Sequence, residues 1–267
     1  MAHIALIGAG PGAADLITVR GLRLLQQAQC ILHDALVSEE LLAMASPDAV
    51  LIPVGKRCGK QSTAQHFINK QLVDAARKYQ RVVRLKGGDP MIFGRADEEM
   101  TALRDAGFDF EVVPGITTAL AAASELQTSL TLRGVSRSVA LLTPAVGHGE
   151  QPHAMVDDIP GADTLAVYMG LKQAAVWAES LLQAGRSAET PVIIAESVSQ
   201  SDQRFTAVTL AQLPSFAMAS ATEAPSTQRE GPCLILIGEA LRARFDMLSS
   251  PLRTDSPVQA DPASHAA

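Results

Sequence analysis

The first 115 residues alternate short apolar runs with segments of helical spacing, and this alternation constrains the fold more than any other feature. The apolar runs are rich in β-branched residues, and several end in glycine. Strands that alternate with helices of this length are typical of βαβ units and a mostly parallel sheet. The predicted strands cover 4–10, 30–34, 49–55, 81–88 and 108–115, and the predicted helices cover 15–28, 36–45 (with Ser38 as N-cap), 63–79 and 96–107.

After Pro114-Gly115 the pattern begins again, which predicts a second α/β lobe. Two long stretches, 144–163 and 219–232, are predicted to be loops with a functional role. The end of the chain, rich in Ser, Pro, Ala and Asp, predicts a mobile tail without a catalytic role. The second lobe has predicted helices at 117–126 and 171–185 and predicted strands at 138–144, 164–170, 191–197, 204–211 and 233–239. The predicted boundaries are 1–113 for the first lobe, 114–245 for the second and 246–267 for the tail.

Composition excludes several classes of protein. Apolar residues make up 47% of the 267 residues, enough to fill ordinary cores, but no apolar run reaches the roughly 18 residues of a membrane span. The N-terminus has no basic segment of the kind that begins a signal peptide. Three distant cysteines fit a reducing cytoplasm without a disulfide framework. A net charge of −6 without a basic stripe argues against nucleic acid as a partner.

Three glycine-containing turns follow predicted strands of the first lobe: GAGPG at 8–12, KGGDP at 86–90 and PGITT at 114–118. The carboxyl ends of parallel strands share one edge of the sheet, where ligands bind in open α/β sheets. The first turn has the spacing G-x-G-x-G with Pro11 inside it, which argues against a dinucleotide fingerprint. The second lacks the Lys-Ser/Thr of a phosphate loop. Backbone groups, one acid and threonine hydroxyls predict a small neutral or cationic ligand, although each turn alone could be only a turn and a helix cap.

Seven blocks of the sequence together resemble a known family. In order along the chain they are GAGPGAADLITVRGLRLLQQA, HDALVS, VGKRCGKQS, VVRLKGGDPMIFGRADEE, VVPGITTALAA, YMG and PCLILIGE. They are similar to the S-adenosylmethionine-dependent tetrapyrrole methylases, and most of all to those that methylate uroporphyrinogen III. The resemblance implies two α/β lobes that enclose a cleft, with S-adenosylmethionine folded between them, in a homodimer. The implied reaction gives precorrin-2, on the way to sirohaem or corrinoids.

The resemblance also implies roles for individual residues. Asp34, in HDALVS, matches the family's candidate base, and Lys56, in VGKRCG, matches its candidate proton donor. Without the resemblance, Asp34 is interpreted as a helix-capping or turn acid and Lys56 as a solvated surface cation. The implied cofactor-binding residues are Pro11, Gly87, Gly88, Asp89, Ile92, Thr117, Thr118, Met169 and Val198. Methyl transfer from a sulfonium needs in-line positioning more than acid–base help at the donor, and this set suits that requirement.

Uroporphyrinogen carries acetate and propionate arms, so an acidic protein must concentrate cations where this substrate binds. Arg95, in FGR, matches the family's substrate arginine, and Arg57 and Arg133 are further candidates because guanidinium groups bind carboxylates in bidentate fashion. The competing interpretation pairs Arg95 with Glu98 or Glu99 on its own helix. The other cations expected at the cleft are Lys56, Lys60, Arg84, Lys86 and Arg137.

The chain departs from the family pattern at three places: Leu132 replaces the usual histidine, PAVGHGE follows Thr143 with His148 displaced, and Ala96-Asp97 replaces glycines. The first two leave the acceptor's identity open, so a methyltransferase for a later precorrin is an alternative. One or two methylations are both compatible with the sequence. An NAD-dependent oxidoreductase and a cofactor-binding protein without catalysis are competing hypotheses from other classes. The six histidines are scattered without the spacing of a metal site, so no metal is expected.

Overall fold

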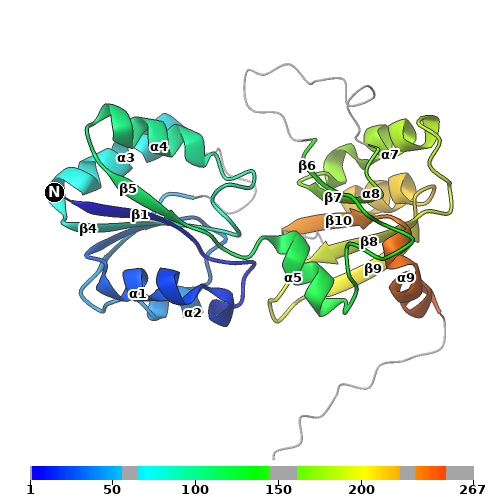
Figure 1. Ribbon diagram of the computed structural model, residues 1–267, viewed down its shortest axis with the longest axis horizontal. Helices are drawn as coiled ribbons and strands as arrows, with labels where there is room; N and C mark the ends of the chain where they lie inside the picture. Colours follow the sequence, from blue (N-terminus) through cyan, green and yellow to red (C-terminus); the bar gives the residue numbers. More distant parts are fainter. Residues whose placement is uncertain (1, 56–64, 145–160, 223–231, 251–267) are drawn as a thin grey trace, which may run out of the picture.

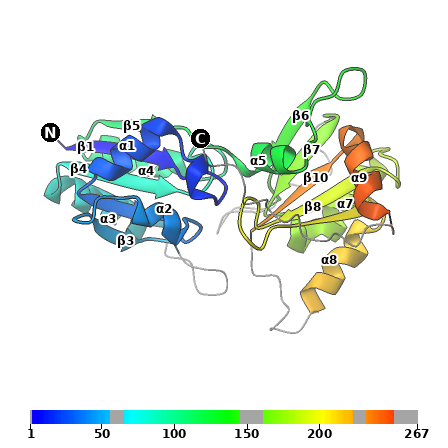
Figure 2. The same cartoon turned by 90° about the horizontal axis from the view of Figure 1, so that it is seen from below.

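The computed structural model describes residues 2–55, 65–144, 161–222 and 232–250. Two lobes, each built on one five-stranded sheet, lie next to each other along the long axis of the molecule, with helix α5 (Thr118–Glu125) where they meet (Figures 1 and 2). No helix within the described ranges is long and apolar enough to cross a membrane.

The first sheet is parallel throughout, with the strand order β3-β2-β4-β1-β5. Helices α3 and α4 cover one face and helices α1 and α2 the other (Figure 1). Alternate residues of each strand point to opposite faces, so Val82 packs under α3 and α4 while Val83 and Leu85 pack under α1 and α2. The strands are β1 His3–Gly8, β2 Cys30–His33, β3 Val50–Pro53, β4 Arg81–Lys86 and β5 Phe110–Val113. The helices are α1 Val19–Gln27, α2 Glu39–Ala43, α3 Gln65–Lys78 and α4 Ala96–Asp105. A short 3-10 turn at Ala14–Leu16 precedes α1.

Two helices of the first lobe begin at hydroxyl caps. The Thr18 side chain accepts a hydrogen bond from the backbone N–H of Gly21 at 3.1 Å, and the Ser38 side chain accepts one from Leu41 at 3.3 Å. Such caps satisfy N–H groups that have no partner inside the helix. The predicted N-cap at Ser38 is confirmed, although α2 is shorter than the predicted helix at 36–45.

The second sheet has the order β6-β7-β10-β8-β9 and is mixed: β6 and β7 are parallel, and the other pairs are antiparallel. Buried Trp177 packs on one face and donates its indole N–H to the carbonyl oxygen of Gly170 at 2.8 Å. The strands are β6 Val139–Leu142, β7 Thr164–Tyr168, β8 Pro191–Glu196, β9 Arg204–Thr209 and β10 Cys233–Ile237. Besides α5, the helices are α7 Ala174–Gln183, α8 Leu213–Thr222 and α9 Arg242–Ser249, with 3-10 turns at Leu171–Gln173 and Glu239–Leu241.

Two helices of the second lobe differ from the sequence predictions. Helix α8 was not predicted, and its last residues fall in the predicted loop at 219–232. Its sequence, LPSFAMASAT, is mostly small and apolar, so it lacks the alternation of polar and apolar faces that marks a surface helix. Helix α9 continues to Ser249, so the tail predicted to start at 246 is wrong for its first residues. Leu248 packs against the core and holds α9 there. The predicted mobility of 251–267 concerns residues outside the described ranges.

Candidate active site

The three glycine turns of the first lobe meet at the carboxyl edge of its sheet, which faces the second lobe (Figure 1). Gly10 and Gly88 exchange two backbone hydrogen bonds, at 3.2 and 2.7 Å. A Cβ on Gly115 would overlap the carbonyl oxygen of Gly88 and lie 2.7 Å from the Cα of Gly8. Only residues without a side chain allow three segments to approach so closely. The expectation that these turns share one edge is confirmed.

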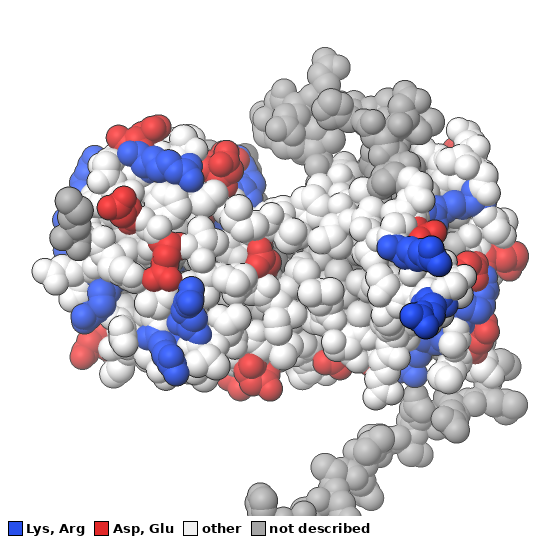
Figure 3. Space-filling view, viewed as in Figure 1, with Lys and Arg blue, Asp and Glu red and all other residues white. Residues whose placement is uncertain are grey.

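Gly88 differs from the glycines around it. Its φ angle is +65°, and a Cβ built on it would meet no atom within 4 Å. The backbone is therefore open to an incoming molecule at this point, and neighbouring Gly87 is half-buried. On the face of the molecule shown in Figure 3, Lys and Arg lie mainly on the outer parts of the two lobes, and the surface between them is largely uncharged.

Asp89 joins two of the turns. Its Oδ1 accepts a hydrogen bond from the backbone N–H of Met91 at 2.8 Å, and its Oδ2 accepts one from Gly115 at 2.9 Å. The sequence suggested an acid available to a ligand, whereas the structure uses both carboxylate oxygens to hold the edge together. Each oxygen keeps a second lone pair for a ligand. Ile92 follows in the same turn and is half-buried.

A segment of the second lobe contacts the first glycine turn. The backbone N–H of Ala13 donates to the Ser199 hydroxyl at 3.0 Å, and a Cβ on Gly12 would lie 2.7 Å from Cγ of Gln200. Pro11 is half-buried beside this contact, and Val198 is buried. The structure therefore brings two predicted cofactor residues from different lobes to neighbouring positions.

Tyr168, which the sequence analysis did not single out, links α5 to the end of β7. Its hydroxyl lies 2.6 Å from Oγ1 of Thr117 and accepts a hydrogen bond from the backbone N–H of Ala119 at 3.1 Å. Burial raises the pKa of Tyr168, against the opposite effect of these hydrogen bonds. The ring of Phe93 lies 5.2 Å away, centroid to centroid. The sequence offered one signal for this contact: a tyrosine at the end of a buried strand needs a hydrogen-bond partner for its hydroxyl.

The backbone around the predicted cofactor residues is strained. Six non-glycine residues of the described ranges have positive φ: four lie in or next to the predicted cofactor positions, and a fifth, Arg95, is a predicted substrate residue. An L-residue in this region costs about 1–2 kcal/mol, and such residues cluster at functional sites. The four at the cofactor positions are Phe93, Met169, Ser197 and Ser199. Met169 itself is 54% exposed, and Thr118 begins α5 at the same junction.

The candidate base Asp34 follows β2 and forms an ion pair with a buried arginine. Nη2 of Arg84 lies 2.5 Å from Oδ1 of Asp34, and Nε of Arg84 lies 2.9 Å from Oε1 of Glu99. Lys86 Nζ lies 3.0 Å from the other oxygen of Glu99. Burial lowers the pKa of Lys86, and Arg84 lowers it further, against the opposite effects of Glu99 and Asp34.

Arg84 and Lys86 were expected among the cations at the cleft, and this expectation is wrong. Both are buried. Positions 82, 84 and 86 of β4 point to the same face of the sheet, so the two cations extend under α4 and toward Glu99. The available signal was this alternation, because charged residues on a central strand must find a partner on the helix that covers them.

The remaining predicted substrate residues have different surroundings. Arg95 makes a bidentate ion pair with Glu98, at 2.7 and 2.9 Å, which is the contact of the competing interpretation. Arg133 lies in an exposed turn closed by the bridge between Leu132 and Ser136. Arg137 is also exposed. Lys56, Arg57 and Lys60 lie outside the described residues, as does the departure at 145–149.

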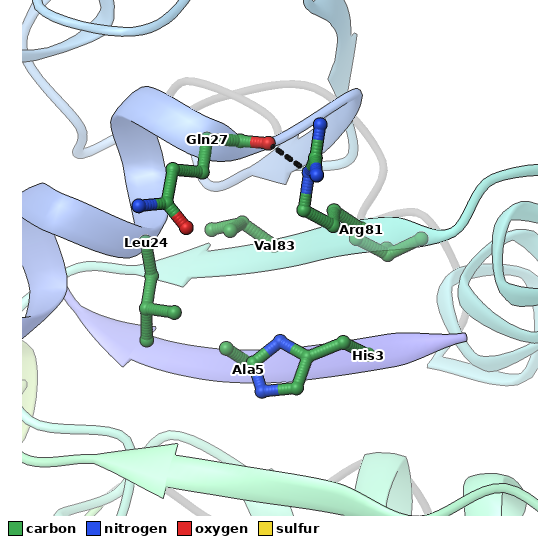
Figure 4. A pocket seen from close by; sticks show the side chains of 7 residues that line it. His3, Ala5, Leu24, Gln27, Arg81 and Val83 are labelled. Carbon is green, nitrogen blue, oxygen red and sulfur yellow. Dashed lines mark hydrogen bonds between the residues drawn. The ribbon is translucent and has the colours of Figure 1, made fainter. Parts of the chain in front are cut away.

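A hollow on the opposite edge of the first sheet is separate from these residues. It lies between β1, β4 and α1, where Arg81 Nε donates to the carbonyl oxygen of Gln27 at 2.6 Å (Figure 4). None of the predicted site residues lines it. In the part of the chain that the structure describes, no three His, Cys, Asp or Glu side chains are grouped so as to hold a metal ion.

The family model of the Tetrapyrrole (Corrin/Porphyrin) Methylases matches residues 3–214. The chain belongs to this family. The predicted family, its α/β fold and the expectation of an enzyme of this type are confirmed.

Solved structures and curated relatives agree with this membership. A uroporphyrin-III C-methyl transferase from Thermus thermophilus, in complex with S-adenyl homocysteine, is 34% identical with a TM-score of 0.76, over 90% of this chain and 99% of that one. A cobalt precorrin-4 methyltransferase is 30% identical with a TM-score of 0.74, over 90% and 95%. The siroheme synthase 2 of Yersinia pestis is 43% identical over 90% of this chain, and the siroheme synthase of Zymomonas mobilis is 42% identical over 95% of it. The chain spans about half the length of these curated relatives, 49% and 52%.

Proposed function

We propose that this chain transfers methyl groups from S-adenosylmethionine to pyrrole carbons of uroporphyrinogen III and gives precorrin-2 for sirohaem or corrinoid synthesis. The observation that carries the proposal is the open backbone at Gly88, at the point where three glycine turns meet. The similarity to the Thermus methyl transferase, which extends over nearly the whole of that protein, supports the choice of substrate.

The edge around Gly88 has the groups that S-adenosylmethionine requires. Its amino acid head, ribose and adenine take hydrogen bonds from backbone groups and hydroxyls, and its sulfonium suits a surface without cations. Gly88 supplies accessible backbone, Thr118 is a half-buried hydroxyl at the start of α5, and Met169 is an exposed apolar side chain. Bound there, the cofactor supplies the methyl group, and the protein's task is to align it with the acceptor carbon.

The acceptor side needs a group that takes up one proton. As the new carbon–carbon bond forms, the methyl–sulfur bond breaks, the sulfonium becomes a neutral thioether and the pyrrole gains the positive charge. The ring then loses a proton. Asp34 is a carboxylate with a 27% exposed side chain at the same edge, and it is the proposed acceptor of this proton. Lys56, the proposed proton donor, follows Gly55, which packs against the backbone of Asp34.

A later precorrin is the second candidate acceptor. The similarity to a cobalt precorrin-4 methyltransferase favours it, and so does Leu132, an exposed apolar residue where the family usually has a histidine. Both candidates use the same cofactor edge, so only the acceptor distinguishes them.

Anaerobic incubation with uroporphyrinogen III and methyl-labelled S-adenosylmethionine, followed by mass spectrometry, tests the proposal. We expect products heavier by one or two labelled methyl groups, and a loss of turnover on the order of 10²–10⁴-fold in Asp34→Asn. The matched control is Asp105→Asn, which removes a carboxylate at the far end of α4. If the protein binds S-adenosylhomocysteine in a calorimeter but adds no methyl group, uroporphyrinogen III is not its acceptor.

The proposal includes a homodimer in the cytoplasm. The family resemblance supports the dimer, and the three scattered cysteines support the compartment. Light scattering at the column outlet measures the mass directly, and a mass of one chain at micromolar concentration would contradict the dimer.

A further inference from the structure

Arg84 connects the proposed base to the interior of the first lobe, and each of its guanidinium nitrogens has a different partner. Nη2 donates to Oδ1 of Asp34 at 2.5 Å, Nε to Oε1 of Glu99 at 2.9 Å, and Nη1 to the carbonyl oxygen of Leu85 at 3.0 Å. A planar guanidinium with three such partners has one orientation. The position of the Asp34 carboxylate is therefore set by a side chain that cannot rotate freely.

Exposure distinguishes Asp34 from the other members of this cluster, which consists of Asp34, Arg84, Lys86 and Glu99. The side chains of the last three are 1–3% exposed, whereas that of Asp34 is 27% exposed. The two cations and two anions balance, as buried charges must. A molecule at the sheet edge can reach only Asp34. Arg84 and Glu99 can influence such a molecule only through that carboxylate.

We propose that Arg84 is a positioning residue for Asp34 and that Glu99 fixes Arg84 in turn. The inference rests on the proposed function, in which Asp34 acts on the acceptor. Arg84 touches no substrate; it fixes the direction in which the carboxylate meets the pyrrole. A displacement of about 1 Å in such a group can cost on the order of 10²-fold in rate.

A double-mutant cycle separates this role from a merely structural one. Arg84→Met removes the guanidinium but leaves Lys86 paired with Glu99, so the two charges that remain buried cancel each other. We expect this variant to lose about 10–100-fold in kcat, with unchanged affinity for S-adenosylhomocysteine. Asp34→Asn keeps the shape of the side chain and removes its charge. If Arg84 acts through Asp34, adding Arg84→Met to Asp34→Asn lowers kcat by less than about twofold, because coupled residues are not additive.

Two further variants keep the cycle decisive. Arg186→Met is the matched control: Arg186 is a half-buried arginine of the second lobe that donates to the carbonyl oxygens of Ala162 and Asp163. It should melt at a lower temperature and keep its kcat. Arg84→Lys keeps the buried charge, but an ammonium lacks the fork that joins Asp34 to Glu99. If Arg84→Met does not fold, Arg84→Lys takes its place, with the same expected loss and the same lack of additivity.

The results separate the inference from the proposed function. If the wild type turns over, two results would overturn the positioning role of Arg84. One is a double variant whose loss in kcat is the product of the two single losses, and the other is a normal kcat for both Arg84 variants. Absence of wild-type turnover with uroporphyrinogen III would overturn the proposed function and, with it, this inference.

Discussion

The two sheets have the same number of strands but very different interiors. The central strand of the first sheet carries Arg84 and Lys86, buried against Glu99. The second sheet is filled mostly by apolar side chains around Trp177, and the hydroxyls of Ser136 and Thr164 lie 2.9 Å apart. Within the described residues of this lobe, Glu196 of β8 is the one charged residue that is buried. Burying an ion costs several kcal/mol even when it is paired. Among the described residues, a buried cluster that joins cations to an anion is therefore a specific property of the lobe that carries Asp34.

The lobes also contribute differently to the candidate site. The first supplies the glycine turns and the charged cluster, whereas the second supplies Tyr168 at the end of β7 and the loop residues Met169 and Val198. Under the proposed function, the first lobe holds the reacting groups and the second adds contacts around them. Five experiments test this division.

Removal of Glu99 should have the largest effect. Glu99→Ala leaves Arg84 and Lys86 buried without their shared anion, and breaking a buried pair costs about 3–5 kcal/mol. Denaturant unfolding measures this loss. The matched control is Glu239→Ala, which breaks an exposed pair with Arg242 and should cost no more than about 1 kcal/mol. Equal losses would show that the interior of the first lobe does not depend on its charges.

Replacing Arg84, Lys86 and Glu99 together with apolar residues removes the buried charges and makes the interior of the first sheet resemble that of the second. In Arg84→Met/Lys86→Met/Glu99→Leu, the free energy of unfolding should stay the same or rise by up to about 4 kcal/mol, as in other replacements of buried ion networks. Methyl transfer should fall at the same time. A lower free energy of unfolding would contradict the expected stability, and full methyl transfer would contradict a role of the buried charges in the reaction.

Arg95 tests whether the first lobe also holds the substrate. If Arg95 binds a substrate carboxylate, Arg95→Lys should lose about ten- to a hundredfold in kcat/KM, because charged hydrogen bonds are worth roughly 1.5–3 kcal/mol. Arg242→Lys is the control, since Arg242 makes the same bidentate pair with a glutamate three residues away. Near-normal kinetics for Arg95→Lys would assign Arg95 to its pair with Glu98 alone.

Gly88 and Gly107 separate ligand contact from backbone strain. Both have positive φ and open space around a built Cβ, but Gly107 follows α4, away from the glycine turns. Alanine should destabilise the fold by about 1–2 kcal/mol at either position. Only Gly88→Ala should weaken S-adenosylhomocysteine binding, by about tenfold or 1.4 kcal/mol in calorimetry. An unchanged affinity would remove Gly88 from the cofactor site.

Replacement of Tyr168 should have the smallest effect on stability, and that effect should depend on pH. Tyr168→Phe loses the hydrogen bonds to Thr117 and Ala119, worth about 0.5–1.5 kcal/mol. The pKa of Tyr168 is raised in the folded protein, so its contribution is complete below about pH 10 and is lost as pH rises through the raised value. Unfolding curves of wild type and variant should therefore converge in alkali. Tyr79→Phe, at the end of α3, is the control, and a constant difference up to high pH would contradict the assignment.

The features that could be predicted from the sequence are those that depend on local pattern. The glycine turns and the strands before them follow from residue order, and so does their meeting at one edge, because parallel strands end together. The cluster of Asp34, Arg84, Lys86 and Glu99 depends on which helix covers which face of the sheet. Sequence reasoning placed Arg84 and Lys86 at the cleft, because residue order alone does not show that α4 covers them. Helix α8 was missed for the opposite reason, since a mostly apolar helix has no periodic pattern to detect.

The order of the charged residues along β4 and α4 also bears on how the chain is made. Lys86 precedes its partner Glu99 by 13 positions and Arg84 precedes it by 15. At the usual speed of a ribosome, the two cations are therefore synthesised roughly one to three seconds before their anion. During that interval Arg84 can pair only with Asp34, and Lys86 lacks Glu99, so strand β4 cannot enter a dry interior with its ion pairs complete. The centre of the first sheet closes only after α4 has been synthesised, so the nascent lobe stays hydrated at its middle until its fourth helix arrives.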